Sequence, residues 1–160
     1  MKIKPKPEGL DKPYVGEIIK TMSKVNVAVY RWTGGLLGSK WRVGSAFPWG
    51  IPVLLLTTRG RKTGQPRTAP LLFIEDGDNL IVVASQGGLP KNPLWYENLR
   101  VHPECEVQIK RRKMKMMART ADSAERAELW PRLVSHYQDF ASYETWTDRV
   151  IPVVILEPRA

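Results

Sequence analysis

The amino-acid sequence predicts a mainly β fold with flanking helices, in the α+β class. Short apolar runs rich in Val, Ile and Leu recur between turn residues, the tight-turn sequence Asp76-Gly77-Asp78 separates two of them, and long crossover helices are missing between successive strands. Antiparallel strands can follow one another through short turns, whereas parallel strands need long crossovers. The sequence therefore favours an antiparallel barrel over a doubly wound parallel sheet.

The first 50 residues are expected to form a basic arm, an amphipathic helix and a Trp-rich connection, ahead of a barrel domain at 51–160, all in one globular unit. Residues 1–13 alternate Lys and Pro and cannot hold a helix. From Tyr14 to Arg31, apolar residues recur at helical spacing with lysines off that stripe. This helix either covers an open face of the core, which the spacing favours, or lies at a membrane interface.

Six strands are expected after the connection. Their predicted ranges are 51–58, 68–75, 79–85, 106–110, 113–120 and 151–157. The first is typical of a buried strand, and the last is strongly apolar. The second and third strands are joined by the Asp-Gly-Asp turn, which is typical of a tight hairpin.

Two helices interrupt these strands. Asn92-Pro93 supplies a candidate N-cap followed by Pro at the first helical position, and His102-Pro103 is expected to end that helix. Asp122 and Glu125 have the spacing of a capping box for a second helix. Pro131 is expected to kink this second helix or to divide it in two.

Composition and charge bound the function classes. The 160-residue chain is 42% hydrophobic and 26% charged, with a formal net charge of +9. That charge fits nucleic acid, an anionic membrane surface or a polyanionic small ligand. No helix-turn-helix, zinc or RNP-like pattern supports nucleic acid, so no nucleic-acid partner is expected.

The single cysteine bears on location. Cys105 cannot form an internal disulfide and has no partner for a metal site, so a reducing cytoplasm and no metal are expected. No apolar run reaches the roughly 20 residues needed to span a bilayer, and the N-terminus has no signal-peptide core. The expected location is the cytoplasm, with the inner face of the cell membrane as a further site for the basic helix.

The strongest local motif is LLLTTRGRKTGQPR, at residues 54–67. An apolar strand ends in two threonines and continues into a turn that holds Arg59, Arg61, Lys62 and Arg67 without an acidic residue. Arg suits phosphate and carboxylate contacts, and glycines let backbone N–H groups approach such a ligand. The spacing of a P-loop or a dinucleotide fold is absent. A solvated basic loop, which the spacing favours, and an anion site both remain open.

Four longer motifs carry a resemblance to a known family. They are LLLTTRGRKTGQPRTAPLLF, the DGD turn, VVASQGGLPKNPLWYENLRVHPECEVQI and ERAELWPRLVSHYQDFASYETWTDRVIPVVILEP. In this order and spacing they resemble the deazaflavin-dependent nitroreductases, whose members use reduced coenzyme F420 and are also described as quinone reductases. The likeness covers nearly everything from Ile51 to Pro158. It implies a split β-barrel like that of the flavin-binding pyridoxamine-phosphate-oxidase group.

The resemblance also implies an activity and a cofactor site. A reduced deazaflavin would pass hydride to a planar electrophile such as a quinone, an enone or a nitroaromatic. Arg61, Lys62 and Arg67 would neutralise the phosphodiester and carboxylates of the F420 tail, with the Thr63 hydroxyl beside them. The other residues implied to contact the cofactor are Thr68, Ala69, Pro70, Leu71, Leu72, Val83, Ala84, Ser85, Gln86, Leu94, Trp95, Tyr96, Glu97, Asn98 and Phe140.

Ser85, Tyr137 and Tyr143 are the implied catalytic residues. Ser85 would hydrogen-bond the ring or the acceptor and assist protonation, while the two tyrosines would line the acceptor pocket. Without the resemblance, Ser85 is more typical of a strand end, and Trp95 and Tyr96 are more typical of packed aromatics.

Three positions depart from the nitroimidazole reducers of that family. Gln86 stands in place of a Lys, Leu72 in place of a Tyr facing the ring, and Phe140 within a row that is otherwise tyrosine. The resemblance therefore supports cofactor binding more strongly than it supports nitroimidazole reduction. Three alternatives stay open. They are FMN in the same barrel, whose single phosphate needs fewer cations, a non-enzymatic protein that binds lipid through its basic helix, and, as the least favoured, a nucleic-acid module.

Overall fold

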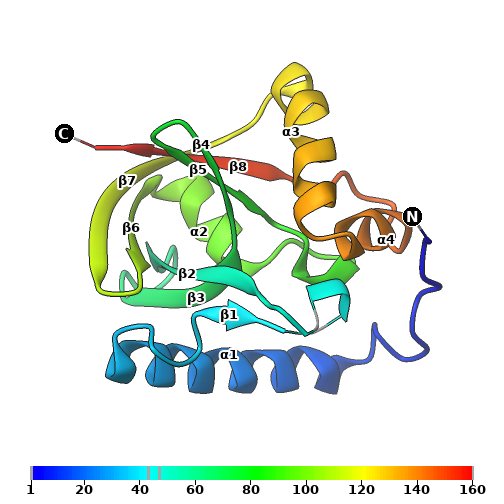
Figure 1. The fold of residues 1–160 in the computed structure, drawn as a ribbon, viewed down its shortest axis with the longest axis horizontal. Coiled ribbons are helices and arrows are strands. Elements are labelled where there is room, and N and C mark those ends of the chain that lie inside the picture. Colours follow the sequence, from blue (N-terminus) through cyan, green and yellow to red (C-terminus); the bar gives the residue numbers. More distant parts are fainter. Residues whose placement is uncertain (1, 43, 47, 160) are drawn as a thin grey trace.

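The computed structural model describes residues 2–42, 44–46 and 48–159. The predicted arm, connection and barrel domain include four residues outside these ranges, at positions 1, 43, 47 and 160. Figure 1 shows a curled antiparallel sheet with helices packed around it.

The strands are β1 (Lys40–Trp41), β2 (Ile51–Arg59), β3 (Pro66–Leu72), β4 (Ile74–Asp76), β5 (Asn79–Val83), β6 (Glu104–Ile109), β7 (Arg112–Thr120) and β8 (Val153–Pro158). The helices are α1 (Pro13–Thr33), α2 (Leu94–Val101), α3 (Ser123–His136) and α4 (Asp139–Thr145). Two short 3-10 helices, η1 (Gly44–Ala46) and η2 (Gln86–Gly88), lie in the connections.

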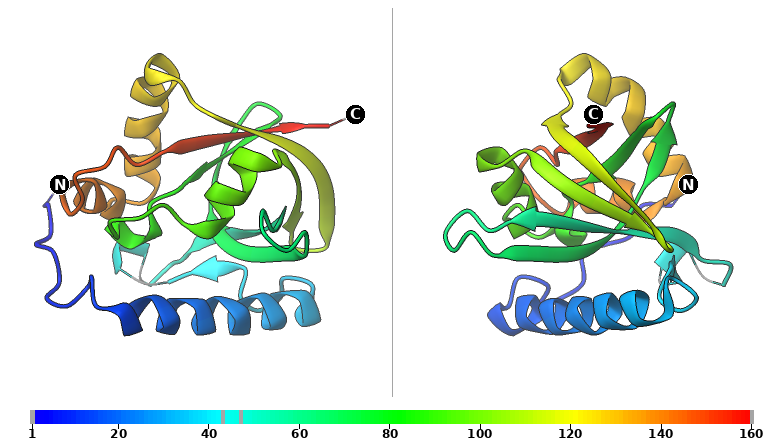
Figure 2. Two further views of the ribbon diagram at one scale, coloured as in Figure 1. Left: turned by 180° about the vertical axis from the view of Figure 1, so that it is seen from behind. Right: turned by 90° about the vertical axis from the view of Figure 1, so that its left-hand side faces the viewer.

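One bent segment closes the sheet. β2, β6, β7, β8, β5 and β4 are paired antiparallel in that order, and β3 pairs with β2. Only Phe73 separates β3 from β4, so the segment 66–76 is paired with β2 at one end and with β5 at the other. The predicted split barrel with flanking helices is confirmed, and Figure 2 shows α2 seated within its curve.

Burial on both faces explains the continuous apolar runs. In β5, Leu80 and Val82 pack in a cluster inside the barrel, whereas Ile81 and Val83 pack in an outer cluster with α3 and α4. The strand β8 alternates between the same two clusters. Successive side chains of a strand point to opposite faces, so a strand buried on both faces is apolar throughout.

The helix α1 crosses the outside of β2 and β3. Its buried residues Val27 and Tyr30 pack against Leu55 of β2. The Tyr30 hydroxyl donates to a β2 carbonyl at 3.1 Å and accepts the amide of Lys110 at the β6–β7 hairpin. A Cβ at Gly35 would come within 2.5 Å of the Lys110 Cα, so glycine is what lets the chain after α1 reach that hairpin.

The start of α2 corrects one prediction. Pro93 is the N-cap, and Asn92 lies outside the helix, where its Oδ1 accepts from Arg149 at 2.7 Å. That contact occupies the Asn92 oxygen that capping would need. The predicted end of the helix at His102-Pro103 is confirmed. The strand predicted over 68–75 is also wrong as a single strand, since the ladder is interrupted at Phe73.

The capping box of Asp122 and Glu125 is confirmed at the start of α3. Pro131 does not divide the helix, because α3 continues through this residue, and the alternative of a kink there stays a prediction. Pro131 leaves the carbonyl of Ala127 without an amide partner, and Ala127 is exposed, so water can hydrate that group. The break comes instead at Tyr137, whose extended backbone directs a buried side chain into the outer cluster.

Candidate functional site

The β2–β3 turn gathers four cations at the surface. Arg59, Lys62 and Arg67 are exposed, and Arg61 is half-buried. Among the residues that the structure describes, no carboxylate forms an ion pair with any of the four. The turn therefore carries positive charge that this chain's own acids leave available for an external anion.

Backbone hydrogen bonds fix the shape of this turn. The Gly60 amide donates to the carbonyl of Gln65 at 2.8 Å, and the Gly64 amide donates to the carbonyl of Gly60 at 2.8 Å. The Thr63 hydroxyl oxygen accepts the Gln65 amide at 3.2 Å, which leaves its proton for a ligand. A Cβ at Gly60 would lie 2.9 Å from that oxygen, so the turn is closed too tightly for a larger residue.

Asn98 ties the turn to α2. It is 3% exposed, and its Oδ1 accepts the Arg61 amide at 3.1 Å and the Arg61 guanidinium at 3.4 Å. Its Nδ2 donates to the Thr58 hydroxyl at 3.2 Å. Buried amides of this kind are normally satisfied within the protein. Asn98 thus positions Arg61, and its predicted contact with a cofactor stays a prediction.

The other predicted residues of α2 divide between core and surface. Trp95 and Tyr96 are buried in the inner cluster with their rings edge to face, at centroids 6.2 Å apart. The Tyr96 hydroxyl lies 3.0 Å from that of Thr120. Leu94 is exposed and Glu97 is half-buried. Of these residues, Leu94 and Glu97 have the side-chain surface that a ligand could contact.

The strand β3 has one edge without a strand partner. It pairs with β2 along its whole length, and no other described strand pairs with it. Residues 68–72 are all half-buried. Ala69 and Leu71 pack on the inner cluster, Leu72 packs on the outer one, and the Thr68 hydroxyl accepts from an α1 arginine at 2.8 Å. The free backbone edge is therefore the part of β3 that remains for a ligand.

The chain leaving β5 presents Ser85. Val83 and Ala84 before it are core residues, so they can meet a ligand only through their backbones. Ser85 is nearly buried, yet its hydroxyl has no hydrogen-bond partner within the described ranges. An unpaired hydroxyl at the edge of a core is free to donate to a bound molecule.

The loop after Ser85 is bound to itself and to α4. With its amide oriented to satisfy its neighbours, Gln86 donates to the carbonyls of Lys91 at 3.0 Å and Asn92 at 3.3 Å. A Cβ at Gly88 would lie 3.1 Å from the Tyr143 carbonyl oxygen, so this glycine permits close packing on α4. Gln86, which stands where the resemblance leads us to expect a Lys, thus stabilises its own loop.

The predicted aromatic row comes together at α4. The Tyr137 ring lies 5.1 Å from the Phe140 ring and 6.2 Å from the Tyr143 ring, between centroids. The Tyr137 hydroxyl lies 3.2 Å from that of Tyr143 and accepts the Trp41 indole N–H at 3.3 Å. Tyr137 is 3% exposed and Phe140 is buried, whereas Tyr143 is half-buried. Only Tyr143 of this row offers appreciable surface to an acceptor.

Burial also determines the ionisation of this row. It raises the pKa of Tyr137, and the nearby Tyr143 adds to that shift. It likewise raises the pKa of Tyr143, against the opposing effect of its hydrogen bond with Tyr137. Both phenols therefore stay protonated at neutral pH and act as hydrogen-bond donors.

The N-terminal arm reaches the same helix, which the sequence did not indicate. The Lys4 ammonium lies 2.6 Å from an Asp139 carboxylate oxygen, the Lys4 amide donates to the Ser142 hydroxyl at 2.9 Å, and the Trp146 indole donates to the Lys4 carbonyl at 2.8 Å. The Ser45 amide donates to the other Asp139 oxygen at 3.1 Å. These partners are far apart in the chain, so no local pattern could have predicted them.

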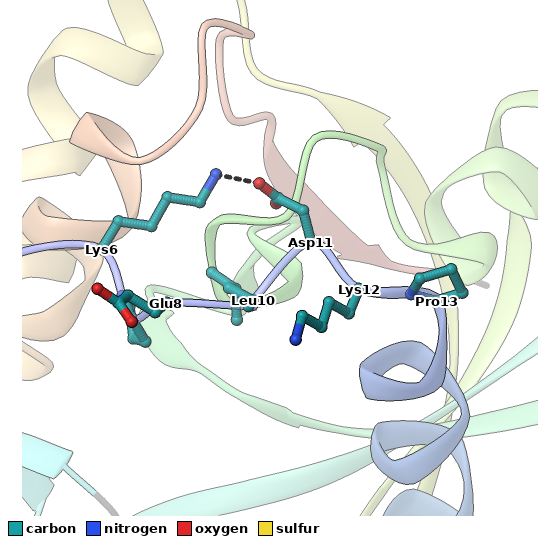
Figure 3. Close-up of a pocket in the computed structure, with 8 residues that line it drawn as sticks. Lys6, Glu8, Leu10, Asp11, Lys12 and Pro13 are labelled. Atoms are coloured by element: carbon teal, nitrogen blue, oxygen red, sulfur yellow. Dashed lines mark hydrogen bonds and ion pairs between the residues drawn. The ribbon is translucent and has the colours of Figure 1, made fainter.

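Two surface hollows involve at most one of the predicted site residues. One of about 530 Å³ is lined by residues 6–13 alone and contains the Lys6–Asp11 ion pair (Figure 3). The other, of about 320 Å³, lies between α2 and β7 and includes Tyr96 as the one predicted site residue. No group of three metal-binding side chains occurs in the described part of the chain.

Comparisons with known proteins agree on one family. Residues 22–158 match the family model described as F420H(2)-dependent quinone reductase. A Mycobacterium tuberculosis protein provisionally named as such a reductase is 49% identical over 118 residues, which cover 74% of this chain and 99% of that protein. A second M. tuberculosis F420H(2)-dependent quinone reductase is 36% identical over 139 residues, or 85% and 89% of the two chains. A solved F420-H2 dependent reductase aligns with a TM-score of 0.62 and 40% identity, over 66% and 94%.

Proposed function

This chain belongs to the F420H(2)-dependent quinone reductase family, and from that premise we propose that it transfers a hydride from reduced coenzyme F420 to a quinone. The family is one of oxidoreductases. One observation carries the proposal for this chain: the β2–β3 turn holds four cations that form no ion pair with a described carboxylate, and it is tied to α2 through Asn98. Such a turn suits a ligand with several negative charges.

The tail of the cofactor accounts for the cations. Coenzyme F420 carries a phosphodiester followed by carboxylates, and Arg61, Lys62 and Arg67 would hold these groups, with the Thr63 proton available beside them. Arg61 is already fixed by α2, so little side-chain freedom is lost when it binds. FMN, the alternative, has one phosphate and leaves most of this charge without a role.

The ring end of the cofactor would lie along the free edge of β3 and the chain leaving β5. When bound, the reduced deazaflavin supplies a hydride in an obligate two-electron transfer. The half-buried residues 68–72 and the exposed Leu94 offer backbone and apolar contacts that orient a flat ring and exclude water. The free Ser85 hydroxyl would hydrogen-bond the ring or the acceptor.

The acceptor would meet Ser85 and Tyr143. Reduction of a quinone to a hydroquinone consumes one hydride and one proton. The Ser85 hydroxyl can donate its proton to the acceptor oxygen and then regain a proton from water. Tyr143 stays protonated because burial raises its pKa, so it serves as a donor to the same class of oxygen. Nitroaromatics and enones share the planar electrophilic chemistry and belong in the same substrate screen.

A membrane contact is proposed as part of this function. Met22, Trp32 and Leu36 on and just after α1 are 62%, 85% and 84% exposed. The exposed side chains of Arg111 and Arg112 lie on the β6–β7 hairpin against which the end of α1 packs. Exposed apolar groups beside cations suit the surface of an anionic bilayer, where lipid-soluble quinones also reside. Within the described ranges, no helix is long and apolar enough to cross that bilayer.

The test is a fluorescence titration of F420 into the purified protein and into its Lys62→Ala and Arg67→Ala variants. Each variant should bind about tenfold more weakly, the loss of roughly one charge-assisted hydrogen bond. Lys113→Ala is the matched control, since it removes the same charge from an exposed strand position outside the turn.

Activity is then followed as quinone-dependent oxidation of reduced F420, with FMN as a competitor in the titration. Equal affinity for F420 in Lys62→Ala, Arg67→Ala and Lys113→Ala would show that the turn is not part of the cofactor site. Failure of the unaltered protein to bind F420, or preferential binding of FMN, would reject the proposed function.

A further inference from the structure

Arg149, just before β8, holds the loop that carries Ser85. Its guanidinium donates to the carbonyls of Ala84 at 3.2 Å, Ser85 at 2.8 Å and Leu89 at 3.0 Å. A fourth hydrogen bond reaches the Asn92 side-chain oxygen at 2.7 Å. One side chain therefore satisfies four acceptors distributed over a single loop.

The charge of Arg149 has no acidic partner in the described part of the chain. The residue is half-buried, and burial lowers the pKa of its guanidinium, although an arginine remains charged at physiological pH. A buried cation is unfavourable unless its donors are satisfied, and here neutral oxygens satisfy them. Since no ion pair explains Arg149, its position is explained by the loop it binds.

Two of these contacts act on Ser85 directly. The Ala84 carbonyl belongs to the peptide plane before the Ser85 Cα, and the Ser85 carbonyl belongs to the plane after it. The two terminal nitrogens of the guanidinium each donate to one of these planes, and together the two hydrogen bonds fix both backbone dihedrals of Ser85. The direction of the Ser85 side chain from its Cα follows from those dihedrals.

We propose that Arg149 is a positioning residue for hydride transfer, which acts by fixing the backbone from which the Ser85 side chain projects. The inference rests on the proposed function for the reaction, and on the hydrogen bonds above for the geometry. Lysine cannot take this role, since a single ammonium does not present a planar fork to two carbonyls. Asn92, which lies outside α2, supplies the fourth oxygen that accepts a hydrogen bond from Arg149.

The test compares Arg149→Lys with Arg126→Lys. Arg126 is also half-buried and donates to a backbone carbonyl, that of Ile151 at 3.0 Å, but it contacts a different segment. Arg149→Lys should lower kcat about tenfold while KM for quinone and Kd for F420 change less than about threefold. Amide hydrogen exchange should become about tenfold faster in the loop after β5 and remain unchanged in α1. The control should leave both measurements as in the unaltered protein.

A double variant separates positioning from general destabilisation. If Arg149 acts through Ser85, then Arg149→Lys should cost little further kcat once Ser85 is replaced in Ser85→Ala, so the two effects are not additive. Additive losses, or an unchanged kcat in Arg149→Lys, would overturn the inference. Should Arg149→Lys fail to fold, Asn92→Ala removes one acceptor and should give a smaller loss of kcat with the same non-additivity.

Failure of the proposed function has a different signature. Absence of F420 binding and of quinone reduction by the unaltered protein would reject the reaction and with it the role of Arg149 in that reaction. Unchanged hydrogen exchange in Arg149→Lys would reject the hold of Arg149 on the loop, whatever the activity.

Discussion

Single side chains in this site act mainly on the backbone. Asn98 binds the amide of Arg61, Arg149 binds three carbonyls, and Gln86 binds two more. Each of them fixes the backbone of a segment of the candidate site. The side chain of Arg61 and the backbone of Ser85 are therefore held before any ligand arrives, which reduces the entropy lost on binding.

Ser85→Ala tests the proposed role of the Ser85 hydroxyl. The hydroxyl makes no hydrogen bond within the described ranges, so its removal should cost little stability. If it donates to the ring or the acceptor, kcat should fall by about ten- to a hundredfold while Kd for F420 stays within about twofold. Stopped-flow oxidation of reduced F420 by a quinone measures the rate, and equal rates in the two proteins would remove Ser85 from the mechanism.

The sequence predicted the parts of the site that are local. Arg61, Lys62 and Arg67 lie within one turn, so their spacing alone indicated a cationic cluster. The partner of Asn98 at Thr58 is 40 residues away, and the acceptors of Arg149 are 57 to 65 residues away. Side-chain contacts at such separations depend on tertiary packing, which no spacing rule contains.

At the scale of elements, α4 connects the loop after β5 with the N-terminal arm. Gly88 packs on its Tyr143, and Lys4 binds its Asp139. Burial opposes ionisation of Asp139, but the hydrogen bonds from Lys4 and the Ser45 amide outweigh it, so its pKa is lowered. The anchoring of the arm therefore depends on a charged carboxylate.

Lys4→Ala should release the arm in a pH-dependent way. Because the folded pKa of Asp139 lies below the unfolded value of about 4, the stabilisation is present above pH 4 and is lost as pH falls through the folded pKa. The variant should lose about 0.5–1 kcal/mol at pH 7, a value reduced by the exposure of Lys4, and progressively less as the pH falls below about 4 towards the folded pKa. Urea unfolding at pH 7 and at a series of pH values below about 4 measures the difference.

Lys6→Ala is the matched control for that prediction. Lys6 pairs with Asp11 at the same distance of 2.6 Å, but both side chains are more exposed than Asp139. Its loss should change the free energy of unfolding by less than about 0.3 kcal/mol. Equal effects of the two variants at pH 7 would show that burial of Asp139 does not strengthen the contact with Lys4.

Strands were easier to predict than helix interruptions. In β8, successive residues of the apolar run at 151–157 are buried in the inner and the outer cluster in turn. A continuous apolar run therefore predicts a strand that is packed on both faces. Pro131 is a strong local signal for a break, yet α3 passes through it because the affected turn faces solvent. The break at Tyr137 follows from where its ring packs, which the local sequence does not encode.

The whole molecule presents one apolar and basic face. The exposed residues of α1 and the following loop lie on the outside of the barrel, away from α3 (Figure 1). The barrel and its two clusters bury the remaining apolar strand residues, so this face is not needed to complete the core. An exposed apolar surface of this kind suits an interface with another phase or molecule.

Met22→Glu and Trp32→Glu test the membrane contact. The protein should sediment with vesicles that contain anionic lipid, and each variant should reduce the bound fraction severalfold. The new carboxylate removes apolar area that would be buried in the bilayer surface, and it is repelled by the anionic headgroups. Val101→Glu is the control, because it alters an exposed apolar residue at the end of α2. Binding to neutral vesicles as strong as to anionic ones, or a loss in the control as large as in the variants, would contradict the proposed surface.

The free edge of β3 has a consequence for self-association. An unpaired strand edge is a template on which another chain can add a strand, and it often leads to aggregation. Pro66 and Pro70 lie four residues apart in β3 and have no amide N–H, so the edge lacks two of the donors that a foreign strand would need. An edge that lacks these donors can stay unpaired and still be a poor nucleus for fibrils.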